Sequence, residues 1–128
     1  MSATWAIEAT DEKALAVLRE VVAERPEYVY SCPEYMAAGR HMSCFYAHTD
    51  EEGALVSAGC VVGVVLNRLG MPLEELAKEE GSGAFSVITR HFPTISGRVR
   101  DLLHDVQMSQ DSGDPWGLAY AKATGKTI

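Results

Sequence analysis

The sequence lacks the features that define several classes of protein. Its longest largely apolar run, residues 54–66, has thirteen residues, whereas a membrane-spanning helix needs about 18. The N-terminal segment has no basic stretch followed by an apolar one, so we expect no signal peptide and a cytoplasmic protein. Cysteine is also scarce, because Cys32, Cys44 and Cys60 are an odd number without a C-x-x-C pair. A complete disulfide framework within one chain is therefore excluded.

Positive charge is scarce as well. The chain has 11 Lys and Arg against 18 Asp and Glu, a formal net charge of −7. This balance repels a phosphate backbone, so we do not expect nucleic acid as a partner. The short apolar run likewise gives no reason to expect a membrane as a partner.

What the sequence does contain is enough apolar material for one folded domain. Of its 128 residues, 47% are hydrophobic and 23% are charged, which is ordinary for a soluble globular protein. No internal repeat and no long Gly, Ser or Pro linker divides the chain. We therefore expect a single domain over residues 1–128, with residues 124–128 as a frayed tail.

The spacing of apolar residues predicts an α+β fold dominated by helices. Turn residues at 50–53 between two apolar segments predict one small antiparallel hairpin near residues 43–57. Three- and four-residue periodicity, with capping residues and helix-ending Gly or Pro, predicts about five or six helices. Their expected ranges are 10–25, 57–69 (capped by Ser57), 72–80, 84–92, 96–113 and 114–123 (capped by Asp114). Residues 28–30 favour at most a short edge strand, because prolines flank them.

One stretch of the chain holds side chains that could bind a metal. Cys44 and His48 are four residues apart and, with Cys60, could supply three zinc ligands. The spacing lacks a tight pair of ligands, so we expect no cofactor, with zinc as the alternative. The same residues could serve a thiol-dependent enzyme, although no catalytic motif accompanies them. His104, one helical turn from Asp101, is interpreted as part of a solvated surface pair.

Residues 57–80 are similar in pattern to a helix-turn-helix. The second helix would present Glu74, Glu75, Glu79 and Glu80 to phosphates, so a transcriptional regulator is a disfavoured alternative. These acids could instead face a basic partner. Gly59 and Gly63 leave a flat face that another backbone could approach, which makes a homodimer conceivable.

Several motifs together carry a family resemblance. They are Tyr28-Val29-Tyr30, Cys44-Phe45-Tyr46-Ala47-His48, Gly59-Cys60-Val61-Val62-Gly63, Leu69-Gly70 and the run from Val106 through Gln-Asp-Ser-Gly-Asp-Pro-Trp to Gly117. The combination resembles small uncharacterised proteins of actinobacteria and of the bacteriophages that infect them. That resemblance implies a phage or prophage context and a cytoplasmic protein. It transfers no catalytic residue.

The last motif has two interpretations. Gln107, Gln110, Asp111 and Trp116 either build a corner between two helices or line a recognition surface for a partner. The negative charge and the absence of a coherent catalytic motif favour a noncatalytic protein-binding module. The family resemblance implies that it is phage- or prophage-encoded, and we expect it to contact a host or viral protein.

Overall fold

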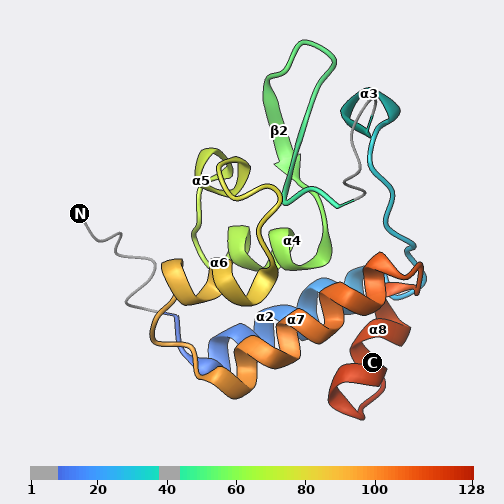
Figure 1. Ribbon diagram of the computed structural model, residues 1–128. Coiled ribbons are helices and arrows are strands. Elements are labelled where there is room, and N and C mark those ends of the chain that lie inside the picture. The colour runs from blue at the N-terminus through green and yellow to red at the C-terminus, as the bar shows by residue number, and fades with distance from the viewer. Residues whose placement is uncertain (1–8, 38–43) are drawn as a thin grey trace.

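The computed structural model describes residues 9–37 and 44–128 and has the expected α+β architecture (Figure 1). Its elements are α2 (Asp11–Glu24), α3 (Glu34–Ala37), β1 (Ala47–Thr49), β2 (Leu55–Ala58), α4 (Val61–Arg68), α5 (Leu73–Ala77), α6 (Ala84–His91), α7 (Gly97–Asp111) and α8 (Trp116–Thr124). All six expected helices and the hairpin are present. The four-residue helix α3 was not predicted, and residues 28–30 form no strand.

Helix α2 begins and ends where its sequence predicts. The Thr10 hydroxyl accepts a hydrogen bond from the Lys13 amide at 3.1 Å, and the helix stops two residues before Pro26. Its buried side chains include Leu18 and Val22, and the helix packs against α4, α8 and α7. The three helices α2, α7 and α8 form the lower part of the molecule, from which the hairpin lies farthest (Figure 1).

Helix α4 lies in the core. Val61, Val62, Val65 and Leu66 are fully buried, and the helix packs against α2, α7 and β2. The expected start at Ser57 is wrong, because Ser57 pairs with His48 in the hairpin and helical structure begins only at Val61. Strand pairing at residues 55–58 therefore takes precedence over the local capping signal.

The hairpin is closed by its acidic turn. β1 and β2 pair antiparallel, with Ala47 opposite Ala58. Oδ1 of Asp50 accepts hydrogen bonds from the amides of Glu52 and Ala54, at 2.9 and 3.0 Å. Gly53 takes a φ of 90°, which a glycine adopts without strain.

Gly59 and Gly63 allow a close backbone approach within the chain. A Cβ at Gly59 would lie 2.3 Å from the carbonyl oxygen of Phe45, and one at Gly63 would lie 2.3 Å from that of Tyr46. The segment that leads into β1 therefore occupies the face that was considered for a homodimer. A second chain could therefore approach these glycines only by displacing residues 45–46.

The corner between α7 and α8 differs in detail from the expectation. Helix α8 begins at Trp116 after Pro115, and Asp114 does not cap it. Instead, Oδ2 of Asp114 accepts hydrogen bonds from the Ser109 hydroxyl at 2.6 Å and the Lys122 ammonium at 2.8 Å. At the other end, Gly125 in the left-handed conformation caps α8 after Thr124, so the tail begins one residue later than expected.

Within the described segments, no helix combines the length and apolarity needed to cross a bilayer.

We predict that Gly63→Ala destabilises the protein, because the new methyl group would overlap the Tyr46 carbonyl. The expected loss in free energy of unfolding is about 2–3 kcal/mol, measured by urea denaturation. Gly97→Ala is the matched control, since nothing lies within 4 Å of a Cβ there. It should change stability by less than about 0.5 kcal/mol or stabilise the helix slightly. Equal effects of the two substitutions would contradict the close approach.

Candidate functional site

The N-terminus of α4 is capped by two side chains from α7. Cys60, at the N-cap position, makes no side-chain capping bond. The amide of Val61 donates to Oε1 of Gln110 at 2.8 Å, and the amide of Val62 donates to Oε1 of Gln107 at 3.2 Å. Both glutamines are buried, so each uses its carbonyl oxygen to satisfy a helix-end donor that water does not reach.

Trp116 joins the same network. Its indole Nε1 donates to Oε1 of Gln110 at 3.1 Å, its side chain is 1% exposed, and Tyr28 packs edge-on against it at 4.9 Å. Gln107, Gln110 and Trp116 are therefore interior residues that fix a helix corner. Their burial does not fit the recognition-surface interpretation, because their polar atoms already bond within the protein. Of the four residues in that interpretation, only Asp111 is exposed.

The amide nitrogens of the two glutamines point to a thiol. Nε2 of Gln107 lies 2.6 Å from Sγ of Cys44, and Nε2 of Gln110 lies 3.9 Å from it. Interaction with the Cys60 thiol and burial raise the pKa of Cys44 far above its usual range. Cys44 is therefore a protonated thiol at neutral pH, which is a poor nucleophile.

His48 has a different partner. The Phe45 amide donates to the Tyr30 hydroxyl at 3.1 Å, which leaves the hydroxyl proton free to donate to Nε2 of His48 at 2.7 Å. Burial lowers the pKa of His48, which is consistent with a neutral, accepting imidazole. Within residues 9–37 and 44–128, no group of three or more His, Cys, Asp or Glu side chains is arranged to hold a metal ion. The zinc interpretation of Cys44, His48 and Cys60 gains no support from this geometry.

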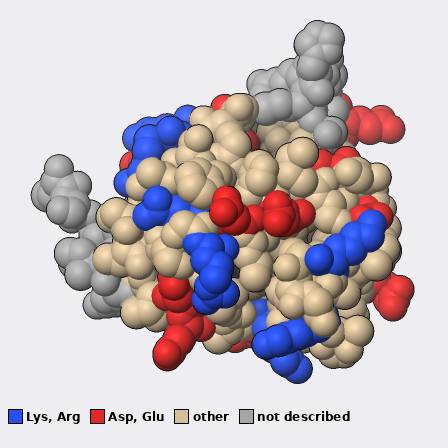
Figure 2. All heavy atoms as spheres, turned by 60° about the horizontal axis from the view of Figure 1, so that its bottom comes forward, with Lys and Arg blue, Asp and Glu red and all other residues tan. Residues whose placement is uncertain are grey.

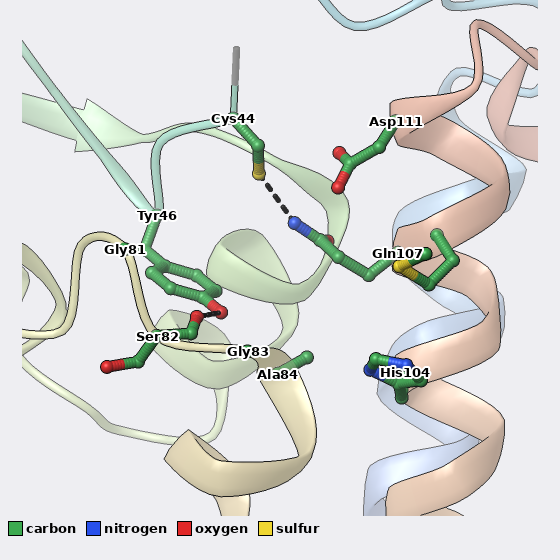
Figure 3. A pocket seen from close by; sticks show the side chains of 10 residues that line it. Cys44, Tyr46, Gly81, Ser82, Gly83, Ala84, His104, Gln107 and Asp111 are labelled. Carbon is green, nitrogen blue, oxygen red and sulfur yellow. Dashed lines mark hydrogen bonds between the residues drawn. The ribbon is translucent and has the colours of Figure 1, made fainter. Parts of the chain in front are cut away.

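Beside Cys44 the surface opens into a recess of about 310 Å³ (Figure 3). It lies between the start of the hairpin, the loop from α5 to α6, and α7. The recess is lined by Cys44, Tyr46, Gly81, Ser82, Gly83, Ala84, His104, Gln107, Met108 and Asp111. The Tyr46 hydroxyl donates to the Ser82 carbonyl at 2.5 Å and so fixes one wall. We call this hollow the α7 recess.

Helix α7 supplies one wall of the α7 recess from a single face. Gln107 and Met108 lie three and four residues after His104, and Asp111 lies four and three residues after them, so successive turns present these side chains on the same side. The interpretation of His104 as a solvated partner of Asp101 is wrong. Nδ1 of His104 is buried without a hydrogen-bond partner among the described residues, and Asp101 borders another hollow. The helical spacing of these four residues was the available sequence signal for this wall.

Asp111 is the charged group of the α7 recess. Its Oδ1 accepts from Nε2 of Gln110 at 2.9 Å, and it forms no ion pair with a Lys or Arg of the described residues. The residue is exposed overall, yet its carboxyl faces Cys44 and Gln107 (Figure 3). Partial burial raises the pKa of Asp111 above the usual 3.8, against the lowering effect of the Gln110 and Cys44 hydrogen bonds.

The helix-turn-helix interpretation does not match the structure. Helix α4 is buried and α5 has only five residues, which leaves no exposed helix long enough to follow a groove. Two of the four glutamates have internal partners: Glu79 pairs with Arg90 at 2.7 Å, and Glu80 accepts the amides of Tyr46 and Ala47. Lys, Arg, Asp and Glu are interspersed on the face shown in Figure 2, without a continuous patch of one sign.

Two other hollows are bordered by described residues. One, of about 430 Å³, lies between α3 and the hairpin, and the other, of about 470 Å³, lies among α2, α7 and α8. The α7 recess differs from both because one of its lining residues, His104, has a buried ring nitrogen without a hydrogen-bond partner among the described residues. It is therefore the strongest candidate site that the geometry offers.

Comparisons with protein-family models, with curated proteins and with solved structures gave no match to this chain. The class that the fold and the site define is a small α+β domain with a polar recess beside its central helices.

We predict that Gln110→Met lowers the free energy of unfolding by about 2–4 kcal/mol, because Val61 and Trp116 would each lose a buried acceptor. Gln107→Met removes the acceptor of one amide only and should cost about 1–2 kcal/mol. Chemical denaturation of both variants measures the difference. A smaller loss for Gln110→Met than for Gln107→Met would contradict the shared-acceptor arrangement.

Asp111 and Asp114 should show opposite effects of charge removal. Because the pKa of Asp111 is raised in the folded protein, ionisation of this carboxyl destabilises the folded state as the pH rises through that pKa. We therefore expect Asp111→Asn to be more stable than wild type near neutral pH. Hydrogen bonds from Lys122 and Ser109 lower the pKa of Asp114 below 3.8, so Asp114→Asn should be less stable there. Both differences should shrink as the pH falls below 3.8. Thermal unfolding across this pH range measures them, and destabilisation by Asp111→Asn at neutral pH would contradict the assignment.

Proposed function

We propose that this protein is a noncatalytic protein-binding module that engages its partner at the α7 recess. The observation that carries the proposal is the combination of a concave polar site with an exposed apolar side chain in its wall. Met108 lines the recess and is 54% exposed. An exposed methionine beside a recess is typical of protein interfaces.

The chemistry of the candidate residues supports binding over catalysis. A cysteine nucleophile needs a lowered pKa and a base within hydrogen-bond reach. The pKa of Cys44 is raised, and His48 is engaged by Tyr30. The remaining groups of the recess can accept and donate hydrogen bonds to a bound side chain without reacting with it.

The biological setting of the proposal rests on the family resemblance. The motifs around Cys44, Gly59 and Trp116 are similar to those of small proteins from actinobacteria and their phages. We therefore propose a phage- or prophage-encoded protein whose partner is a host or viral protein.

A comparison of two exposed apolar residues tests this proposal. Met108→Asp places a charge at the recess, whereas Leu118→Asp makes a similar change on α8, where Leu118 is 45% exposed and outside the recess lining. We expect a protein captured from host lysate by the wild-type chain and by Leu118→Asp, and at least about tenfold less of it by Met108→Asp. Capture that is equal for both variants, or no specific capture by wild type, would overturn the proposal. Circular dichroism confirms that both variants are folded.

A further inference from the structure

We propose that the α7 recess binds a cationic side chain, a lysine or arginine of the partner protein, with Asp111 as its counter-ion. This inference rests on the proposed protein-binding function and specifies the chemistry of the partner. It follows from three features of the recess: a carboxylate without a Lys or Arg partner, a hydroxyl that can accept a hydrogen bond, and an apolar side chain at the edge.

The first feature is the carboxylate of Asp111. Asp111 accepts an amide hydrogen bond from Gln110, but it pairs with no Lys or Arg of the described residues. The ten residues lining the recess include no Lys or Arg, and their one basic side chain is His104. By contrast, Asp114 and Glu79 both have a Lys or Arg partner. A carboxylate that faces a recess without a counter-ion leaves a place for a cation from outside the chain.

The Ser82 hydroxyl also lines the recess and can accept a hydrogen bond. An ammonium or guanidinium group carries several donors and no acceptor, so it can bond to this hydroxyl and to the Asp111 carboxylate together. An anion would meet the Asp111 carboxylate, which no Lys or Arg of the lining offsets.

The wall of the recess also suits the aliphatic part of such a side chain. Met108 lies on the same face of α7 as Asp111 and exposes about half of its surface. Lysine and arginine carry three or four methylene groups that pack on apolar surface while the charge reaches a polar group. The net charge of −7 favours the approach of a basic partner over long range.

Short capped peptides test the inference. The probes are acetyl-Gly-Lys-Gly-amide, acetyl-Gly-Arg-Gly-amide and, as the neutral control of similar shape, acetyl-Gly-Met-Gly-amide. Binding is followed by amide chemical shifts in the full-length protein at low salt. We expect the two cationic peptides to shift the amides of Ser82, Gly83 and Asp111, with dissociation constants in the millimolar range typical of a single side-chain contact. The methionine peptide should bind at least about fivefold more weakly.

Matched variants separate a specific counter-ion from general attraction. Asp111→Asn and Asp101→Asn remove the same charge from the same helix, and Asp101 lies outside the recess. We expect Asp111→Asn to weaken binding of the lysine peptide at least about fivefold and Asp101→Asn to weaken it less than about twofold. Equal losses in the two variants, or equal binding of the methionine peptide, would overturn the inference.

The outcome is distinguishable from that of the proposed function. Protein capture that depends on Met108, without binding of either cationic peptide, would refute the cation site and leave the binding module standing. Binding of the peptides without Met108-dependent capture would support the cation site and refute the proposed function.

Discussion

The structure depends on how one buried helix is capped. Helix α4 lies in the core, and its first amides have no capping group from their own segment. Gln107 and Gln110 of α7 supply the two acceptors, and Gln110 also accepts the indole of Trp116, so α4, α7 and α8 are joined through buried hydrogen bonds. Because unsatisfied donors in an apolar interior are costly, this network restricts how the three helices can be arranged.

The same network shapes the candidate site. A primary amide has two ends, and once the two carbonyl oxygens cap α4, the amino groups are left to face Cys44 and Asp111. The α7 recess thus lies on the solvent-facing side of the hydrogen-bond network that caps α4. Burial and the neighbouring Cys60 make Cys44 an unreactive thiol, whereas Asp111 keeps a carboxylate beside open space. A carboxyl group such as that of Asp111, whose ionisation destabilises the fold and which faces a hollow, is a candidate for contact with a ligand.

Much of the fold could be predicted from local patterns. Apolar periodicity and the Thr10 cap define α2, and the acidic turn at Asp50 defines the hairpin, because these signals act over a few residues. The predicted helix starts at Ser57 and Asp114 are wrong. Ser57 pairs with His48 in the hairpin, and Asp114 forms an ion pair with Lys122 instead of capping α8. The four-residue helix α3 lies between a proline and a segment outside the described residues, and it has no periodicity to detect.

By itself, the sequence determined the α+β class, the order of the helices and the acidic charge, because composition and short-range spacing decide these properties. Only the tertiary structure decided that Gln107, Gln110 and Trp116 lie inside, that Cys44 faces two glutamines while His48 bonds to Tyr30, and that His104 borders a recess. These placements depend on partners 18 or more residues away in the sequence or on burial by several helices. The spacing of residues along a chain does not encode which distant donor an acceptor meets.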